Sequence, residues 1–211
     1  MQAQWAELEA ALAAGRARAL GVYNFCAASL DCVLAAATTP PALNYVMRHV
    51  GMGPDASGVL AASAARGVRA VAYGTLGEPV ALASVLASAA LRDVACAHGR
   101  SVEEVALRWN LQAGYAVSNR PTADYAPENA PATAACADGA CRAAVAAMAH
   151  AHGWALTDAE VAALDALRFD EYPQAPTYYS SSGCPDSFGV SAHPTASSCR
   201  SNAWSSTVMW C

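Results

Sequence analysis

Apolar and polar positions near the start of the chain follow first a helical and then a strand-like spacing. Over residues 3–14 (AQWAELEAALAA), Trp5, Leu8 and Leu12 recur every three to four positions, which predicts an amphipathic helix. Residues 17–25 (ARALGVYNF) are a short apolar run that ends in polar residues, as is typical of a buried strand. The pattern therefore opens with a helix and a strand.

The alternation of helices and strands continues along the chain. Expected helices cover about 29–37, 56–66, 84–98 and 101–112, and expected strands cover 42–46, 68–76 and 115–119. Ser101 and Glu104 form a capping box at the start of the last of these helices. Strands that alternate with helices at this spacing predict an α/β fold with parallel strands. Four such units fit either a small open sheet or an arc of a barrel, and the pattern alone does not decide between them.

The pattern changes after the fourth expected strand. Residues from about 131 to 153 form an alanine-rich insertion, and Thr157 with Glu160 forms a second capping box that predicts a further helix. Residues 169–211 are rich in Ser and Pro and show no sustained period, which predicts an irregular tail that also contains cysteines. We therefore expect one main domain over residues 1–168.

Composition and charge narrow the possible functions. The chain has 211 residues and a formal net charge of −5, and its arginines are scattered, so no basic stripe favours nucleic acid. No apolar run reaches the roughly 18–20 residues of a membrane span, and the N-terminus lacks a secretory signal, so we expect a cytoplasmic protein without membrane contact. All 12 basic residues are Arg, so no lysine is present to form a Schiff base.

The eight cysteines favour thiols over a metal site. The first three lie in alanine-rich helical patterns, where a thiol behaves as a small apolar group, and they are Cys26, Cys32 and Cys96. A zinc site in the tail is the alternative, with the potential ligands Cys184, His193, Cys199 and Cys211. These spacings match no common zinc module, so we expect no bound metal.

Five segments in a fixed order are the most specific signal in the chain. They are WAELEAALAAGRARALGVYNF at 5–25, PALNYVMRHV at 41–50, VRAVAYGTLG at 68–77, HGRSVEEVALRWNLQAG at 98–114 and, more loosely, YAVSNRPTADYAPEN at 115–129. Together they resemble the C-terminal half of the aldo/keto reductase family, whose closing helix is also similar to LTDAEVAALDAL at 156–167.

This resemblance implies a fold and a reaction. Aldo/keto reductases are TIM (β/α)₈ barrels that act at the C-terminal ends of their strands. They are oxidoreductases that reduce aldehydes and ketones by hydride transfer from NADPH, without a metal. We therefore expect a partial barrel of four parallel βα units, corresponding to the second half, followed by a helical and irregular C-terminal tail. The expected partner is a small carbonyl substrate.

The family's catalytic residues are not expected in this chain. They are a tyrosine acid, a lysine that lowers its pKa, an aspartate and a histidine, and they lie on the first four strands of the family barrel. The resemblance begins after those strands, and the chain has no lysine at all. No residue of this chain is therefore expected to be catalytic, and its status as an enzyme is left open.

The expected nicotinamide end of the cofactor site follows from the matched motifs. Asn24 matches the asparagine that hydrogen-bonds the carboxamide, and Tyr73 matches the tyrosine on which the ring stacks. Leu76 and Gly77 match the loop beneath the pyrophosphate, where backbone N–H groups donate. The alternatives are structural, since Asn24 could be a polar cap and Tyr73 a core aromatic residue.

The chain departs from the family at several of these positions. Tyr23 stands where a serine is usual, Tyr45 replaces a glutamine, and Gly74 replaces a serine, which removes one hydroxyl that would bond the cofactor. A phenol cannot reproduce the paired donor and acceptor of an amide. These changes predict a weaker nicotinamide end of the site.

The adenosine end is less well preserved. Arg120 stands where the family neutralises the 2′-phosphate of NADP, and Tyr125 stands where the family has an arginine. Glu128 and Asn129 match residues that hydrogen-bond adenine, although an ordinary helix start is an equal explanation. NADP is therefore the expected cofactor, with NAD as the alternative.

The histidines are expected to be structural or solvated. His49 stands where the family has a structural histidine, and His98 precedes a helix-ending glycine, a common solvated site. His150 and His152 lie in the alanine-rich insertion. None is expected to act in catalysis.

Half of a barrel exposes two strand edges, each with unpaired N–H and C=O groups. Because native stability is only about 5–15 kcal/mol, the loss of half a core is a severe penalty. Three hypotheses follow: a truncated gene product, a non-catalytic nucleotide-binding module that forms a homodimer through its exposed edges, or a reductase that uses replacement residues.

Overall fold

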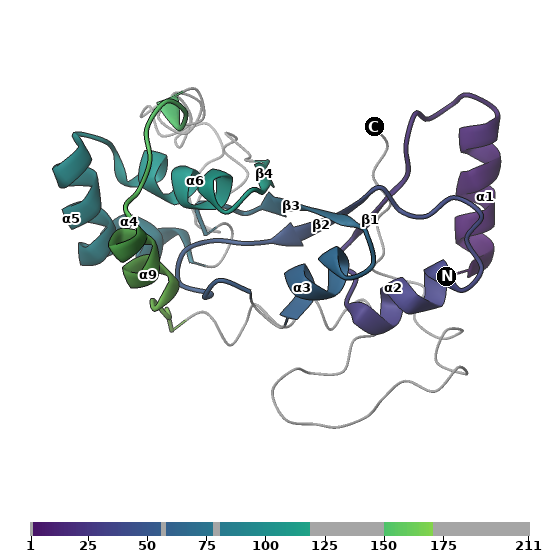
Figure 1. The fold of residues 1–211 in the computed structure, drawn as a ribbon, viewed down its shortest axis with the longest axis horizontal. Coiled ribbons are helices and arrows are strands. Elements are labelled where there is room, and N and C mark those ends of the chain that lie inside the picture. The colour runs from purple at the N-terminus through teal and green to yellow at the C-terminus, as the bar shows by residue number, and fades with distance from the viewer. Residues whose placement is uncertain (1, 56–57, 78–80, 119–149, 171–211) are drawn as a thin grey trace, which may run out of the picture. The chain divides into compact units, whose positions relative to one another are not determined.

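Four strands form one parallel sheet in which the spatial order follows the chain order (Figure 1). The computed structural model describes residues 2–55, 58–77, 81–118 and 150–170. The strands are β1 Gly21–Tyr23, β2 Leu43–Met47, β3 Arg69–Tyr73 and β4 Ala116–Val117. Helices connect successive strands, as parallel pairing requires. The expected α/β fold with parallel strands is confirmed.

Two compact units make up the described part of the chain. The first contains residues 2–47, 55 and 58–71, and the second contains residues 48–54, 72–77, 81–118 and 150–170. Each unit has its own cluster of buried apolar side chains. The clusters share no residue, so each unit has a core of its own.

The first unit contains the helices α1 Gln2–Ala13, α2 Ala27–Leu34 and α3 Val59–Ala64. Its apolar cluster is Trp5, Ala17, Leu20, Val22, Phe25, Leu30, Val33 and Val68. The expected apolar stripe of α1 packs on this cluster, and Trp5 Nε1 donates to the carbonyl of Thr39 at 3.1 Å. The stripe read from the sequence therefore fixes which face of α1 is buried.

An ion pair joins the second and third helices of the first unit, which lie side by side (Figure 1). Arg66, just after α3, donates from Nε and Nη2 to the two carboxylate oxygens of Asp31 in α2, each at 2.7 Å. The Arg66 hydrogen bond lowers the pKa of Asp31 and raises that of Arg66. The Asp31 side chain is largely exposed and that of Arg66 is half-buried, so the contribution of the pair to stability is expected to be small.

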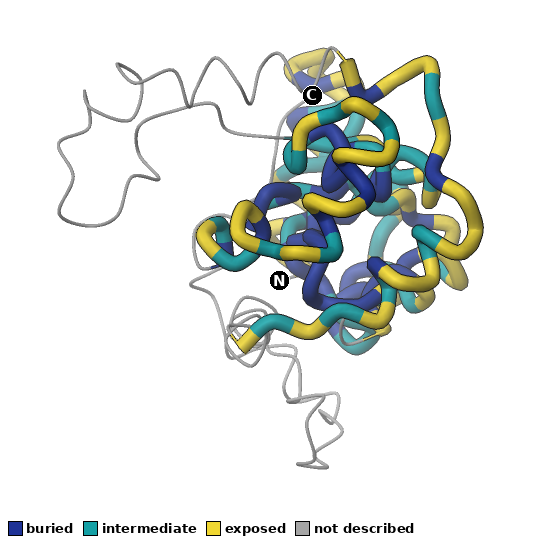
Figure 2. The backbone as a smooth tube through the Cα atoms, turned by 90° about the vertical axis from the view of Figure 1, so that its left-hand side faces the viewer, coloured by how far each residue is buried: buried dark blue, intermediate teal, exposed yellow. Residues whose placement is uncertain are grey.

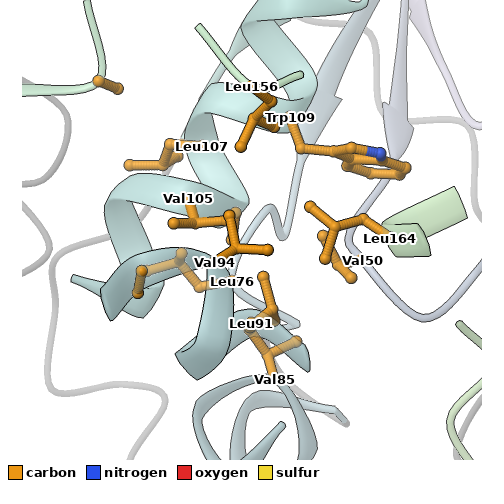
Figure 3. Packing of buried hydrophobic residues seen from close by; sticks show 13 residues of the cluster. Val50, Leu76, Val85, Leu91, Val94, Val105, Leu107, Trp109, Leu156 and Leu164 are labelled. Atoms are coloured by element: carbon orange, nitrogen blue, oxygen red, sulfur yellow. The ribbon is translucent and has the colours of Figure 1, made fainter. Parts of the chain in front are cut away.

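The second unit contains α4 Leu82–Ala87, α5 Ala89–His98, α6 Val102–Gln112 and α9 Asp158–Asp165. Figure 3 shows their side chains converging on a core that includes Leu91, Leu107, Trp109 and Leu164. Trp109 Nε1 donates to Asp165 Oδ1 at 2.8 Å, which satisfies the indole within the core. Helix α9 is therefore an integral part of this unit.

Burial along the helices explains why they form. In α5 the buried residues are Leu91, Val94 and Ala95, and most of the intervening positions are exposed. In α6 six of the 11 residues are buried, so this helix is the central one of its unit. Figure 2 shows the resulting alternation of dark blue and yellow along the backbone. In α5 the helical period read from the sequence therefore matches one-sided burial, whereas α6 has no exposed residue.

One expected helix is wrong. The segment from 84 to 98 is not a single helix, because Ser88 has an extended conformation with φ −61° and ψ 120° and separates α4 from α5. The Ser88 hydroxyl accepts a hydrogen bond from the N–H of Leu91 at 3.4 Å, so it caps the second helix. A serine inside an alanine-rich run therefore starts a new helix.

Both expected capping boxes are confirmed. Ser101 caps α6 together with Glu104, and Thr157 caps α9 together with Glu160. In each box the hydroxyl accepts from the N–H three residues later, and the carboxylate accepts from the N–H of the cap. Two orphan backbone donors are satisfied at each helix start.

Several expectations lie outside the described residues. They concern most of the insertion at 131–153 and the tail beyond 170. The division into a main domain over 1–168 and a tail over 169–211 therefore stays a prediction. None of the helices in the described part of the chain is long and apolar enough to cross a membrane.

The expectation for the cysteines is wrong at two positions. Cys26 and Cys32 are disulfide-bonded, whereas Cys96 is a free and exposed thiol. Alanine-rich surroundings made all three look like small apolar residues, but the local sequence pattern carries no information on sulfur partners. Cys26 and Cys32 are therefore cross-linking residues.

Candidate functional site

Asn24 lies directly after β1, at the end of a strand in the first unit. It is buried and has a positive φ of 56°, a conformation that asparagine tolerates better than most residues. Its backbone N–H donates to the carbonyl of Tyr45 at 2.9 Å, which extends the pairing with β2 by one residue. The position expected to bind the carboxamide is therefore a tightly constrained turn.

Asn44, on β2, holds this turn in place. Its Nδ2 donates to the carbonyl of Phe25 at 2.7 Å, and its Oδ1 accepts from the N–H of Phe25 at 3.1 Å. The same Nδ2 lies 3.1 Å from Ser63 Oγ, and Ser63 Oγ donates to the carbonyl of Val59 at 2.7 Å. Asn44 has no exposed surface, so these buried bonds link the end of β1, β2 and α3.

Two tyrosines lie beside this turn. Tyr23 and Tyr45 are register partners on the parallel strands β1 and β2, which places them on the same face of the sheet. Their ring centroids are 5.6 Å apart with an interplanar angle of 40°, and both residues are half-buried. Two of the three departures from the family pattern, Tyr23 and Tyr45, therefore form one aromatic pair.

Tyr73, at the carboxyl end of β3, belongs to the second unit. Its carbonyl accepts from the N–H of Arg48 at 3.1 Å, and the carbonyl of Ala72 accepts from the N–H of Ser118 at 2.7 Å. Bonds from two other segments therefore fix the backbone where β3 ends. Tyr73 itself is half-buried.

Arg48 is a buried cation next to this strand end. Its guanidinium carbon lies 3.6 Å from the ring centroid of Trp109 and 4.8 Å from that of Tyr115. Its Nη1 donates to Asn110 Oδ1 at 2.8 Å, and its Nε lies 3.3 Å from the carbonyl of Pro54. Stacking on aromatic faces and hydrogen bonds to neutral acceptors keep this charge inside the protein.

A tight turn follows Tyr73. The N–H of Gly77 donates to the carbonyl of Gly74 at 2.8 Å, and the N–H of Ala81 donates to the carbonyl of Gly77 at 2.6 Å. Gly77 has φ +90°, and a Cβ there would lie 2.6 Å from the carbonyl carbon of Ala81. Glycine is therefore required at this position. Its amide donates within the turn, and its expected role at the pyrophosphate stays a prediction.

Thr75, inside this turn, carries an unsatisfied polar atom. Its side chain is buried, and its Oγ1 has no hydrogen-bond partner. Among the buried side-chain nitrogen and oxygen atoms of the described residues, no other lacks a partner. A buried hydroxyl without a partner destabilises the fold by about 1–3 kcal/mol, so this atom calls for an explanation.

The structure places the expected cofactor residues in two groups. Asn24 is in the first unit, whereas Tyr73, Leu76 and Gly77 are close together in the second. The three residues expected at the adenosine end lie outside the described residues, and they are Arg120, Glu128 and Asn129. Their roles stay predictions.

The histidines differ from one another. His49 is buried with its Nδ1 2.7 Å from the carbonyl of Val50, in agreement with a structural role. His98 is not a solvated residue, because its Nε2 lies 3.0 Å from both carboxylate oxygens of Glu160. Two hydrogen bonds lower the pKa of Glu160: the larger effect comes from the backbone N–H of Thr157, and the next from the side chain of His98. His98 is therefore a link between α5 and α9.

Sequence reasoning missed Asn44 and Arg48 as organising residues. Asn44 stands in the matched strand motif, but its partners are 19 residues away on both sides. Arg48 pairs with Asn110, 62 residues later. No local pattern could have indicated these bonds. Within the described residues, no group of three or more His, Cys, Asp or Glu is placed to hold a metal ion.

The class of fold follows from comparison with solved structures. An aldo-keto reductase of Bombyx mori, solved in complex with NADP, matches 76% of this chain and 48% of its own, with a TM-score of 0.58 and 20% sequence identity. The four-stranded parallel sheet with its helices is therefore part of an α/β barrel of the TIM type.

The family follows from the sequence. The family model described as "Aldo/keto reductase family" matches residues 1–168. The chain belongs to the aldo/keto reductase family, a family of NADPH-dependent oxidoreductases.

Two curated relatives illustrate the match. Deoxymugineic acid synthase 1 of Oryza sativa subsp. japonica is 38% identical over 117 residues, which cover 54% of this chain and 36% of the relative. NADPH-dependent codeinone reductase 1-4 of Papaver somniferum is 33% identical over 115 residues, covering 52% and 35% respectively. The chain spans about a third of the length of these relatives. Its correspondence to the second half of the family barrel stays a prediction.

Proposed function

We propose that this chain is the dinucleotide-binding part of an oxidoreductase that reduces an aldehyde or ketone with NADPH. The observation that carries the proposal is the segment Tyr73–Gly77, where an aromatic residue at a strand end is followed by a turn that excludes any side chain at Gly77. The relative from Papaver somniferum is NADPH-dependent by name, which supports NADP over NAD.

The residues present fit a dinucleotide in two respects. The backbone around Tyr73 is fixed by two neighbouring segments, which is what an aromatic stacking platform needs. The unsatisfied Thr75 hydroxyl in the following turn offers a donor to an anionic group. The bound dinucleotide would supply the hydride.

The chain's own residues would bind and orient the cofactor. Tyr73 would cover one face of the nicotinamide, so that the other face meets the carbonyl. Asn24 would hold the carboxamide. Arg120, Glu128 and Asn129 would hold the adenosine end, and Arg120 would favour the 2′-phosphate of NADP through charge-assisted hydrogen bonds. Leu76 would line the passage of the diphosphate.

The proton donor is proposed to come from outside this chain. The family's donor is a tyrosine assisted by a lysine, and the chain contains no lysine. The absence of lysine also favours a second candidate function, in which the chain binds a nucleotide without catalysis. In this candidate function the chain pairs with a second copy through its sheet edges. For the first candidate function, the reductase, we propose a cytoplasmic location and a small carbonyl compound as substrate.

Titration with NADPH tests the first step of the proposal. Tyr73→Ala is expected to weaken binding about tenfold, because a stacking surface is removed, whereas Tyr73→Phe keeps the ring and should bind within about threefold of the original chain. Calorimetry or quenching of protein fluorescence measures both variants. Equal binding by Tyr73→Ala and the original chain would contradict the proposed platform.

Turnover and assembly separate the two candidate functions. The chain alone is expected to bind NADPH without oxidising it in the presence of 4-nitrobenzaldehyde, as followed by NADPH absorbance. Turnover by the chain alone would contradict an external proton donor. Sedimentation analysis then decides between a monomer, which favours the incomplete reductase, and a dimer, which favours the non-catalytic module.

A further inference from the structure

The Thr75 hydroxyl is the one buried side-chain polar atom without a partner in the described part of the chain. A valine has nearly the same shape and leaves no donor unsatisfied, so it would suit an apolar position better than threonine does. A buried polar atom without a partner is rare in native proteins and calls for a specific explanation, of which a missing ligand is one.

The place of this hydroxyl is fixed. Thr75 lies between Gly74 and Gly77, whose carbonyl and N–H close the turn at 2.8 Å. The N–H of Ala81 then donates to the carbonyl of Gly77 at 2.6 Å, which fixes the end of the turn. The hydroxyl is thus held in a closed turn two residues after the expected nicotinamide platform at Tyr73.

Comparison with the family pattern gives a reason for a hydroxyl group at this turn. The family pattern has a serine directly after the tyrosine, and this chain has Gly74 at that position. Thr75 supplies a hydroxyl one residue later. A hydroxyl that donates to a phosphate oxygen makes a charge-assisted hydrogen bond, which is stronger than a bond between neutral groups.

We infer that the Thr75 hydroxyl donates to the diphosphate of the bound dinucleotide, in place of the serine hydroxyl that Gly74 lacks. The inference rests on the proposed function and adds a ligand-binding residue to it. Because the oxygen is enclosed, the groups that cover it must shift before a phosphate oxygen can reach it. Binding should therefore include a conformational step, visible as an association rate that saturates with ligand concentration.

The inference is tested with Thr75→Val and the matched control Thr75→Ser in the full chain. The ligands are NADPH and ADP-ribose, which shares the diphosphate but lacks nicotinamide. Thr75→Val is expected to weaken both ligands about tenfold, whereas Thr75→Ser keeps the hydroxyl and should bind within about threefold. A loss of affinity shared by the two ligands locates the Thr75 bond outside the nicotinamide.

Urea unfolding without ligand gives the second measurement. If the hydroxyl has no partner in the unliganded protein, Thr75→Val should unfold at the same or a higher urea concentration than the original chain. A lower midpoint together with unchanged affinity would show that the hydroxyl serves the fold, through a buried water for example, and would overturn the inference.

Failure of the Thr75 bond and failure of the proposed function give different results. If the original chain binds NADPH and Thr75→Val binds it equally well, the Thr75 bond is wrong and the proposed function stands. If the original chain binds neither NADPH nor ADP-ribose, the proposed function is wrong, and the role of Thr75 is wrong with it.

Discussion

Single side chains in this protein connect segments that are far apart in sequence, and Asn44 is the strongest case. One amide bonds both backbone groups of Phe25 and reaches Ser63 on α3. Asn44→Ala leaves these buried groups without partners, so the free energy of unfolding should fall by about 2–4 kcal/mol. Urea denaturation measures this change.

The matched control for Asn44→Ala is Gln4→Ala, at an exposed position of α1. It should change the free energy of unfolding by less than about 0.5 kcal/mol. A loss of similar size in both variants would mean that the Asn44 bonds are not what stabilises the turn after β1.

Gly77 allows a comparison between two glycines with positive φ. Gly77→Ala places a Cβ 2.6 Å from backbone atoms at φ +90°, whereas Gly15→Ala at φ +70° meets nothing within 4 Å. The first should lower the free energy of unfolding by about 3 kcal/mol, from both strain and collision, and the second by about 1 kcal/mol, from strain alone. Thermal unfolding of both variants measures the difference, and equal losses would contradict the close approach at Gly77.

At the residue scale, the sequence predicted types of position better than their partners. It indicated a structural role for His49, whose Nδ1 lies 2.7 Å from the carbonyl of the next residue, Val50. The stacking of Arg48 on Trp109 and the pairing of His98 with Glu160 could not be predicted, since both join residues about 60 positions apart. The fold alone brings such residues together.

Between elements, the charge of Glu160 makes both the cap of α9 at Thr157 and the contact of α9 with His98 on α5 sensitive to pH. The pKa of Glu160 is lowered from 4.5 in the folded protein, so its charge stabilises the fold above that pH. The stabilisation is lost as the pH falls below 4.5 and through the lowered pKa of the folded state. Acid should therefore weaken this helix packing.

Glu160→Gln isolates the effect of the charge, because glutamine can still complete a capping box. At pH 7 the variant should be less stable by about 0.5–1 kcal/mol, and the difference should shrink as the pH falls below 4.5 and through the lowered pKa of Glu160. Urea unfolding at a series of pH values gives the measurement. Glu7→Gln, at an exposed position of α1, is the control. A difference that does not vary with pH would contradict the role of the carboxylate.

At the element scale, capping boxes were predictable and the helix break at Ser88 was not. A capping box is complete within four residues, so the sequence alone contains both of its halves. Ser88 breaks the helix because Val85 and Leu91 must both enter the same core from two helices, a tertiary requirement. The alanine-rich residues on both sides of Ser88 favour one continuous helix, so the sequence pattern did not indicate a break there.

For the whole molecule, the two separate apolar clusters predict that substitutions in different clusters act independently. Val33 belongs to the cluster of the first unit and Val105 to that of the second. Each change to alanine should lower the free energy of unfolding by about 2 kcal/mol, and the double variant by the sum within about 0.5 kcal/mol. Urea denaturation of the three variants checks this, and a large deviation would show that the clusters are coupled.

At this scale the order of motifs predicted the fold well. Helices alternating with strands gave the parallel sheet, and five ordered segments gave the family. The disulfide bonding of Cys26 and Cys32 could not be predicted, because a sulfur partner depends on tertiary proximity.

The stack of Arg48 on Trp109 gives this protein an optical probe of its own. The indole is buried, covered by a guanidinium at 3.6 Å and hydrogen-bonded to Asp165 at 2.8 Å, so its emission differs from that of a hydrated tryptophan. Loosening of α6 or α9 would expose the ring and shift its emission to longer wavelength. Once the other four tryptophans of the chain are replaced by phenylalanine, local opening of the second unit can therefore be followed without an attached dye.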